Sequence, residues 1–373
     1  MYSRDLTLKI YAILTGRSTG IIPSVLQIAL MPLSWIYGLT VMARNYFYDR
    51  GILTSRNLDC GVISVGNIVA GGTGKTPIVI WLAKHFRNSG YRVAIILRGY
   101  KREAKSEIGI VSDGTKILLS SAESGDEAFM TALELPEIPV LVSNNRYKAG
   151  TEAIRKWDTQ VIILDDGFQH QKLKRDLDIV VIDSQRPFGN GQMLPAGILR
   201  EPKRALQRVD LLLLTHTNFV SNLSDTRSKI ETIAGQKTIF ESQYHPTKLY
   251  KSDDSQHLPF ESLKNQKILL VCGIGNPETF VRSIEKHHPS YIELMVFPDH
   301  HQYKEKDILR IQRQARIMKA DIIVTTQKDE QKLLLYADQL LVFVLAIEVR
   351  FSPEHGRSMK DMLNLYAQTC LPL

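Results

Sequence analysis

Residues 62–77 read VISVGNIVAGGTGKTP, and this stretch decides the fold. An apolar, β-branched run leads into a glycine-rich turn, and residues 78–87 after the turn have the apolar spacing of a helix. A strand, a glycine loop ending in Gly-Lys-Thr and a helix form the layout of a phosphate-binding P-loop. The stretch therefore predicts that the chain binds a nucleoside triphosphate.

Glycines let backbone N–H groups approach phosphate oxygens closely, and the helix N-terminus adds partial positive charge. The pattern assigns cofactor contacts to Gly71, Gly72, Thr73, Gly74, Lys75 and Thr76. Lys75 is expected to reach the β- and γ-phosphates, and the hydroxyl of Thr76 suits Mg²⁺. One position departs from the full pattern, because Val69 stands where a glycine is usual. The alternative is a glycine-rich turn that binds nothing, and the flanking strand and helix argue against it.

Size and composition set broad limits on the protein. A chain of 373 residues predicts two domains, or one large α/β domain with additions. The cysteines, Cys60, Cys272 and Cys370, have no pairing or metal-binding spacing, which favours a reduced cytosolic setting. The net charge of +8 favours anionic partners. Nucleic acid is the least supported of these, because no Lys/Arg block is interleaved with aromatic residues.

The N-terminal region contains a long uncharged segment. No charged residue occurs between Arg17 and Arg44, and the apolar run has the roughly 20 residues that a membrane span needs. Pro23 and Pro32 predict a break or kink. An interfacial helix pair, a true span and a soluble core hairpin all fit, and aromatic residues such as Trp35 favour the interface. Residues 1–50 are therefore predicted to form a membrane-associated helical segment.

From residue 61 to residue 183 apolar strands alternate with helical patterns. The predicted strands are 62–65, 92–97, 140–142, 161–164 and 179–182, and the predicted helices are 78–89, 126–134 and 146–156. This alternation predicts a P-loop NTPase-like, mostly parallel sheet with helices on both faces. Ligands are then expected at the carboxyl ends of the strands.

Four regions follow from these patterns. Residues 1–50 are the helical segment, 51–175 the P-loop core, 176–335 a second, smaller α/β domain, and 336–373 a C-terminal strand and helix expected to pack back on the core. The boundary at 175/176 is placed where the predicted Walker B region ends.

Two predicted strand ends carry charge. Residues 161–164 are apolar and run into Asp165 and Asp166, as in a Walker B strand that supplies a carboxylate for Mg²⁺. A solvated acidic turn is the alternative. The strand 92–97 ends in Arg98, followed by Tyr100 and further cations, which could clamp a phosphate or form a solvated basic loop.

Three further segments have less specific patterns. In the Ser-Gly-Asp-Glu segment, Asp126 could be a helix cap or a functional acid. Residues 186–202 form a long loop rich in glycine, proline and apolar residues, which predicts a functional role. His300 and His301 follow Asp299, and this arrangement fits a metal site and an acid–base or orienting role equally well.

Taken together, these segments resemble the tetraacyldisaccharide 4′-kinase family, the lipid A 4′-kinases of Gram-negative bacteria. The resemblance is carried by seven segments in the same order, at residues 65–77, 98–100, 125–127, 165–170, 194–202, 297–300 and 326–329. Each is weak alone, and together they are highly specific. Val69 is compatible with the loop of this family.

The resemblance implies an ATP- and Mg²⁺-dependent kinase. It would move the γ-phosphoryl group of ATP to the 4′-hydroxyl of a tetraacyl glucosamine disaccharide 1-phosphate, giving lipid IVA in lipid A biosynthesis. It would act at the cytoplasmic face of the inner membrane, without nucleic acid or an obligate protein partner.

The resemblance also implies roles for individual residues. Asp126 becomes the catalytic base, His300 its partner from the second domain, and Arg200 a cation that faces developing phosphate charge. Thr76 with Asp165 or Asp166 would hold the metal. Substrate contacts would come from Arg98, Tyr100, Gln169 and His170.

Two rival functions differ in their acceptor. A soluble small-molecule kinase or ligase of the same P-loop group would not require acyl chains. A nucleotide-switched ATPase or GTPase would phosphorylate no acceptor at all, and Ala70 counts against it because the dimeric switch ATPases carry a lysine there.

Overall fold

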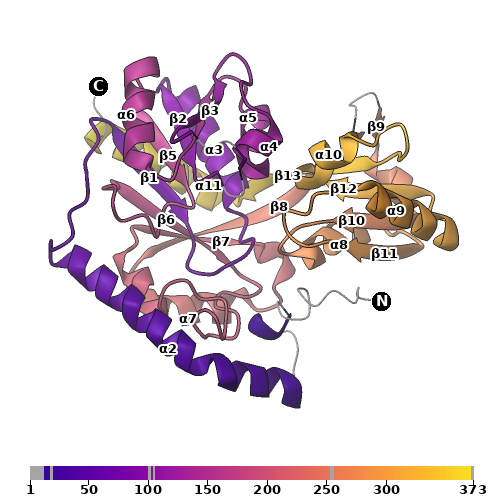
Figure 1. Cartoon of the computed structure of the whole chain (residues 1–373), viewed down its shortest axis with the longest axis horizontal. Helices are drawn as coiled ribbons and strands as arrows, with labels where there is room; N and C mark the ends of the chain where they lie inside the picture. Colours follow the sequence, from indigo (N-terminus) through magenta and orange to yellow (C-terminus); the bar gives the residue numbers. More distant parts are fainter. Residues whose placement is uncertain (1–11, 17–19, 100–101, 104–105, 253–255, 371–373) are drawn as a thin grey trace. The chain divides into compact units, whose positions relative to one another are not determined.

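A computed structural model describes residues 12–16, 20–99, 102–103, 106–252 and 256–370 (Figure 1). They form two compact units. The large unit contains residues 12–243 and 351–370, and the small unit contains residues 244–350. Strand β8 (Thr238–Lys251) begins in the large unit and ends in the small one. Both units are α/β with mostly parallel strands, so the predicted fold class is confirmed.

The sheet of the large unit has the P-loop strand near its middle. Its strand order is β8-β7-β6-β1-β5-β2-β4-β3. The bounds are β1 Gly61–Gly66, β2 Val93–Leu97, β3 Gly109–Asp113, β4 Pro139–Val142, β5 Val161–Asp165, β6 Leu177–Asp183 and β7 Leu211–Thr215. All these strands pair in parallel except β3, an antiparallel edge strand that the sequence did not predict. Loops at the carboxyl ends of β1 and β5 therefore lie side by side.

Helices cover both faces of this sheet (Figure 1). Their bounds are α3 Lys75–Asn88, α4 Ser121–Ser124, α5 Asp126–Glu134, α6 Arg146–Trp157, α7 Leu223–Ala234 and α11 Pro353–Cys370. Ile162 and Leu164 of β5 pack with Ala149 and Ala153 of α6. Helix α3 packs against β1, β2 and β5. Because successive strand residues point to opposite faces, the near-continuous apolar strands are buried from both sides.

The boundary expected at 175/176 is corrected, because the large unit continues to residue 243. Strand β6 pairs directly with β1, and β7 pairs with β6. Strand pairing joins residues distant in sequence, so local composition did not reveal it. The predicted C-terminal region is also divided. Strand β13 (Phe343–Phe351) pairs with β12 (Ile322–Thr326) of the small unit, whereas the ring of Phe351 lies 4.7 Å from that of Trp81 on α3.

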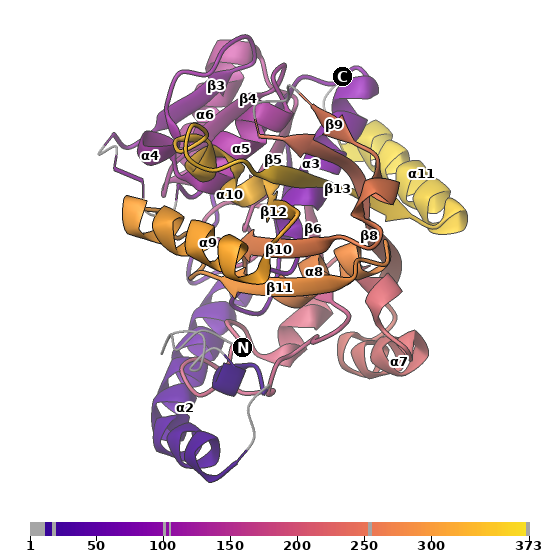
Figure 2. The ribbon, with the colours of Figure 1, turned by 90° about the vertical axis from the view of Figure 1, so that its right-hand side faces the viewer.

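The small unit repeats the α/β design with the order β11-β10-β12-β13-β8 (Figure 2). Its elements are β9 His257–Leu258, β10 Lys267–Cys272, α8 Pro277–Glu285, β11 Tyr291–Val296, α9 Glu305–Met318, β12 Ile322–Thr326 and α10 Gln327–Leu334. Leu270 of β10 packs with Phe280 of α8, and its neighbour Leu269 packs with Ile308 of α9. This unit therefore has a core on each face of its own sheet.

The N-terminal apolar segment is one helix, α2 (Ile21–Asp49), of 29 residues. It is therefore neither a helix pair nor a hairpin. Pro23 lies in the first turn, where a missing backbone N–H leaves no hydrogen bond unmade. Pro32 lies inside the helix without ending it. By its length and composition alone, the helix is long and apolar enough to cross a membrane.

Helix α2 turns a narrow face of small residues toward the rest of the large unit. Its buried positions are Ser34, Gly38 and Val41. The Ser34 hydroxyl donates to the Met193 carbonyl oxygen at 2.9 Å and accepts from the Ala196 N–H at 2.8 Å. The large apolar side chains point outward, with Trp35 and Leu39 among those more than half exposed.

Gly66, at the end of β1, is predicted to tolerate no side chain. A Cβ there would lie 2.5 Å from the Phe168 Cβ and 2.8 Å from the Phe168 backbone nitrogen. Gly66→Ala is expected to destabilise the protein by about 1–3 kcal/mol, seen as a lower midpoint of thermal unfolding. Gly38→Ala is the matched control, because its Cβ would meet Met193 at an ordinary 3.8 Å inside a helix. An unchanged midpoint for Gly66→Ala would contradict the close contact.

Candidate active site

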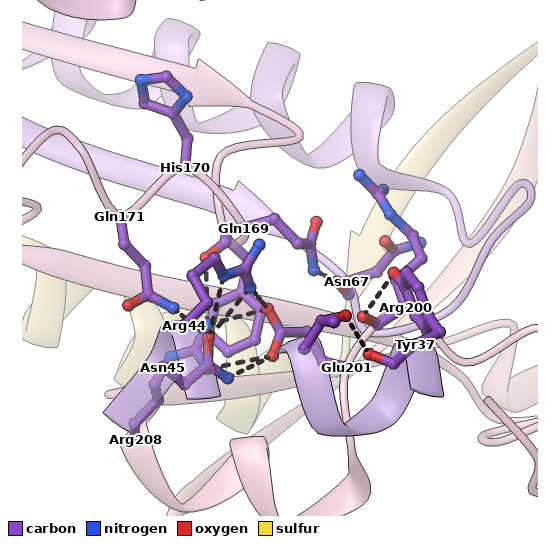
Figure 3. Close-up of polar contacts among 12 residues, drawn as sticks. Tyr37, Arg44, Asn45, Asn67, Gln169, His170, Gln171, Arg200, Glu201 and Arg208 are labelled. Atoms are coloured by element: carbon purple, nitrogen blue, oxygen red, sulfur yellow. Dashed lines mark hydrogen bonds and ion pairs between the residues drawn. The ribbon is translucent and has the colours of Figure 1, made fainter. Parts of the chain in front are cut away.

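The loop between β1 and α3 is held in shape by three side chains. The Asn67 amide donates to the Thr73 hydroxyl at 3.0 Å, and the Thr215 hydroxyl donates to the Thr73 carbonyl oxygen at 2.9 Å. Gln169 donates from Nε2 to the Asn67 carbonyl oxygen at 2.8 Å (Figure 3). Gly71 and Gly74 have φ of 109° and 82°, values that favour glycine. These hydrogen bonds and glycine conformations therefore define the shape of the loop.

The structure explains why Val69 can stand at a position where the P-loop pattern usually has glycine. Its side chain is buried in a core cluster with Ile198 and Leu199. Its backbone pairs with that of Leu199, and the Ala70 N–H donates to the Ile198 carbonyl oxygen at 2.6 Å. The start of the P-loop is thus joined to the Gly/Pro-rich loop 186–202. A side chain at position 69 adds to the core, so glycine is not required there.

The two adjacent acids at the end of β5 have opposite environments. Asp165 is buried, and the Thr76 hydroxyl lies 3.5 Å from its Oδ2. Burial, and secondly the negative charge of Glu127, raise the pKa of Asp165 to about 7. The positive charge of Lys75 lowers this pKa but does not outweigh burial and Glu127.

Asp166 instead lies between two cations. Its Oδ1 is 3.4 Å from Lys75 Nζ, and both its oxygens accept from Arg200 Nη1 at 2.9 Å. Burial opposes ionisation of Asp166, but these ion pairs outweigh it and lower its pKa to about 2. Asp166 has a φ of 55°, which turns it away from the direction of the strand.

Asp126 is the first residue of α5, and Gly125 occupies the N-cap position. The alternative role as a cap is therefore wrong. Ser121 donates from Oγ to Asp126 Oδ1 at 3.1 Å. A helix N-terminus favours the ionised carboxylate. The next residue, Glu127, is the acid that acts electrostatically on Asp165. The start of α5 therefore brings its acids to the carboxyl end of β5.

A buried cation, Arg146, lies beside this group. It begins α6, is 4% exposed, and has a pKa lowered to about 10 by burial, with Asp166 as the main opposing charge. The sequence did not identify it. The only available signal was a cation at a helix N-terminus, where the dipole disfavours positive charge. Arg98 is exposed after β2 and is close enough to act electrostatically on Arg146.

The other residues predicted to contact substrate lie in different environments. His170 is partly buried, and burial, followed by Arg146 and other cations, lowers its pKa to about 4, so the imidazole is neutral at pH 7. Its side chain points away from that of Gln171 (Figure 3). Gln169 Oε1 has no hydrogen-bond partner among the described residues. Tyr100 lies outside the described residues.

His300 belongs to the small unit and follows β11. It has a φ of 61°, and its Nε2 lies 4.0 Å from Asp299 Oδ2. Asp299 accepts from Lys328 Nζ at 2.8 Å. The acid and the lysine come from the carboxyl ends of two parallel strands, where polar groups gather in such sheets. These residues come from the last two of the seven segments that carried the family resemblance.

Comparison with known proteins agrees with this geometry. The sequence profile of the family described as Tetraacyldisaccharide-1-P 4'-kinase matches residues 26–364. The chain belongs to this family. The tetraacyldisaccharide 4'-kinase of Syntrophus aciditrophicus is 42% identical over 332 residues, covering 86% of this chain and 88% of that protein. That of Geobacter sulfurreducens is 37% identical, covering 90% of this chain and 93% of that protein.

A solved structure supports the same assignment. The kinase resembles LpxK from Aquifex aeolicus, solved in complex with ATP, with a TM-score of 0.71 and 33% sequence identity. The alignment covers 91% of this chain and 99% of that structure. The predicted family and the predicted enzyme class, an ATP-dependent phosphotransferase, are therefore confirmed.

The different environments of Asp165 and Asp166 lead to opposite expectations for stability in nucleotide- and Mg²⁺-free protein. When folding raises the pKa of a carboxyl group, the folded protein becomes less stable as the pH rises from the unfolded-state pKa of that group to its folded-state pKa. Asp165→Asn should therefore raise the midpoint of thermal unfolding at pH 8 and have little effect at pH 4. Asp166→Asn removes a carboxylate with a lowered pKa, so it should lower the midpoint at pH 8. Equal shifts for both variants would contradict the assigned environments.

Proposed function

We propose that this kinase transfers the γ-phosphoryl group of ATP to the 4′-hydroxyl of a tetraacyl glucosamine disaccharide 1-phosphate, giving lipid IVA. Family membership supports the reaction. The observation that carries the assignment to this site is the pairing of the P-loop lysine, Lys75, and a second cation, Arg200, on one carboxylate, Asp166. Beside them lies Asp165, whose pKa is raised. This distribution of charge suits a nucleotide whose phosphates arrive together with a divalent cation.

Thr76 and Asp165 are the proposed Mg²⁺ ligands. Their oxygens are hard donors already 3.5 Å apart, and the raised pKa of Asp165 fits a site that is completed by a cation. Bound Mg²⁺ would neutralise charge on the phosphate oxygens. Asp166 is assigned to hold Lys75 and Arg200 in place. The described residues contain no group of three or more His, Cys, Asp or Glu suited to a metal, and Mg²⁺ typically uses one or two carboxylates with phosphate oxygens and water.

Asp126 is the proposed general base. The 4′-oxygen attacks the γ-phosphorus, the bond from that phosphorus to the bridging oxygen of ADP breaks, and the hydroxyl proton passes to the Asp126 carboxylate. Its support is its position at the start of α5, next to the Glu127 that influences Asp165. We assign His300 an orienting or pKa-tuning role toward Asp126, on the resemblance to the family. A carboxylate of ordinary pKa is a weak base toward an alcohol, so such a partner is chemically useful.

Cations around the transferred group would stabilise its negative charge. Lys75 and Arg200 are assigned to the phosphates, and buried Arg146 is added to them because it interacts with both Asp165 and Asp166. Substrate contacts are assigned to Arg98, Tyr100, Gln169 and His170. Of these, Gln169 and His170 lie three and four residues after Asp166 in the sequence. The two ring nitrogens of neutral His170 can donate one hydrogen bond and accept another.

The acceptor and α2 together support membrane association. A substrate with four acyl chains stays in the bilayer, so the enzyme must reach it there. The exposed face of α2 carries Ile21 at 84%, Ile28 at 69% and Trp35 at 64% exposure. Such a contiguous apolar surface is typical of a protein or membrane contact. We place the kinase on the cytoplasmic face of the inner membrane, with α2 in contact with lipid.

Asp126 can be tested by transfer of labelled γ-phosphate from ATP to a lipid disaccharide 1-phosphate in detergent. Asp126→Ala should lower kcat by roughly 10²–10⁴-fold, as is typical for loss of a general base. Glu123→Gln in the neighbouring helix α4 is the control, because that side chain is exposed and, among the described residues, accepts hydrogen bonds from Ser120 alone. A kcat within a few-fold of wild type would show that Asp126 is not the base. Equal turnover of a deacylated disaccharide would favour a soluble small-molecule kinase, and hydrolysis without acceptor phosphorylation would favour a switch NTPase.

Membrane contact can be tested without removing α2. The combined substitution of Ile28, Trp35 and Leu39 by serine changes only outward-facing residues. It should lower binding to phospholipid vesicles and activity on vesicle-borne substrate by about tenfold or more, while activity in detergent stays within about twofold. Leu309→Ser is the control, because Leu309 is similarly exposed, at 57%, on α9. Equal losses in vesicles and detergent would contradict the proposed contact.

A further inference from the structure

Glu201 is a fully buried carboxylate at the junction between α2 and the large unit, with 0% exposure. Its Oε1 accepts from Arg44 Nη2 at 2.7 Å, and its Oε2 accepts from Asn45 Nδ2 at 2.7 Å (Figure 3). Arg208 adds a longer ion pair at 3.5 Å. Both carboxylate oxygens are therefore bonded, and two of the donors come from the C-terminal turns of α2.

This junction is more specific than a helix attachment requires. Removing a carboxylate from water costs several kcal/mol, and apolar residues of similar volume often hold two elements together as well or better. Buried ionic groups can instead define one arrangement of two elements, and here they define one register of α2. Tyr37, two turns before Arg44, adds a hydrogen bond from its hydroxyl to the Arg200 carbonyl oxygen at 3.1 Å.

The residue before Glu201 reaches the proposed phosphate site. Arg200 Nη1 donates to both oxygens of Asp166 at 2.9 Å, while the Arg200 N–H donates to the Ile68 carbonyl oxygen at 2.8 Å. The side chains of two consecutive residues thus bind different elements. Glu201 binds α2, and Arg200 binds the Walker B acid Asp166. One peptide unit connects α2 with the group of charges around Lys75.

A second connection reaches the segment after Asp166. Gln171 donates from Nε2 to Asn45 Oδ1 at 2.7 Å. Arg208, bound to Glu201, donates to the Phe168 carbonyl oxygen at 3.2 Å and lies 4.0 Å over the Phe168 ring. The loop 166–171 and residues 200–201 are therefore fixed by the same polar junction.

We propose that Glu201 is a positioning residue that couples the seating of α2 to the placement of Arg200 at the phosphate site. In lipid the hydrophobic effect does not press a helix against its protein, so small residues and hydrogen bonds hold it in place. The narrow inward face of α2 carries such contacts, and its apolar face is left for the bilayer. A correctly seated α2 then completes the phosphate site. The inference rests on the proposed role of Arg200.

A double-mutant cycle on kcat/KM in detergent tests the coupling in full-length protein. Arg200→Gln is expected to lower kcat/KM by roughly 10²-fold, as is typical for loss of one charge-stabilising donor. Glu201→Gln keeps the size of the side chain and is expected to lower it by about tenfold. If Glu201 acts through Arg200, adding Glu201→Gln to the Arg200→Gln protein should cost less than about twofold.

The helix side of the junction is tested in the same way. Asn45→Ala should lower kcat/KM in detergent several-fold in the wild-type background and less than about twofold with Arg200→Gln. Ile36→Ser is the matched control on the same helix, because Ile36 is 60% exposed and faces away from the junction. It should leave kcat/KM in detergent within about twofold, so a loss limited to the junction supports the coupling.

The outcomes separate the possible explanations. A purely structural effect of Glu201→Gln would reduce the active fraction by the same factor in both backgrounds, and such additivity would overturn the inference. Active-site titration with a slowly dissociating nucleotide analogue provides the correction for that fraction. If Arg200→Gln alone stays within twofold of wild type, the proposed role of Arg200 is wrong and the inference falls with it. If Glu201→Gln has the kcat/KM of wild type, the proposed role of Arg200 is unaffected but the coupling is refuted.

Discussion

The Asp166 carboxylate, held between Lys75 and Arg200, is the interaction on which the site depends. It joins the P-loop, the Walker B strand and the loop after β6 through one pair of oxygens. Each of these segments comes from a different part of the chain, and their separation in sequence makes the arrangement sensitive to any shift of one element. Two cations close together repel each other, so a shared carboxylate keeps them near the position of the phosphates.

The contrast between Asp165 and Asp166 shows how neighbouring residues of identical chemistry acquire different properties. Asp165 is the last residue of β5 and Asp166 follows it, but the positive φ of Asp166 turns it toward Lys75 and Arg200. Asp165 is buried within the strand, and the negative charge of Glu127 acts on it as well as the positive charge of Lys75. The ion pairs with Lys75 and Arg200 therefore favour the ionised form of Asp166, whereas burial and Glu127 disfavour the ionised form of Asp165. This division suits a nucleotide that brings Mg²⁺ with it.

On α2 the apolar and polar faces are exchanged relative to those of an ordinary surface helix. Its large apolar residues face outward, and its small and polar residues face the large unit. In water such a surface would be a liability, whereas against lipid it allows the inner face to carry specific hydrogen bonds. The buried Glu201 junction and the loop 186–202 receive this face, and the same loop holds the start of the P-loop at Val69. The proposed membrane contact and the P-loop are thus connected through this loop.

The sequence by itself determined the P-loop, the parallel α/β class and the family, because these depend on local patterns: glycine spacing, apolar runs and helix starts. The role of the Walker B acids stays a prediction. It predicted α5 at 126–134 as the structure has it, and placed most strands within one or two residues. Only the tertiary structure decided that β6 and β7 extend the P-loop sheet, that Asp166 rather than Asp165 pairs with Arg200, and that Arg146 is buried beside them. The tertiary structure likewise joined Glu201 to Arg44 and Asn45, 157 and 156 positions away. Such contacts arise from strand register and chain crossing, and neither leaves a signal in local sequence.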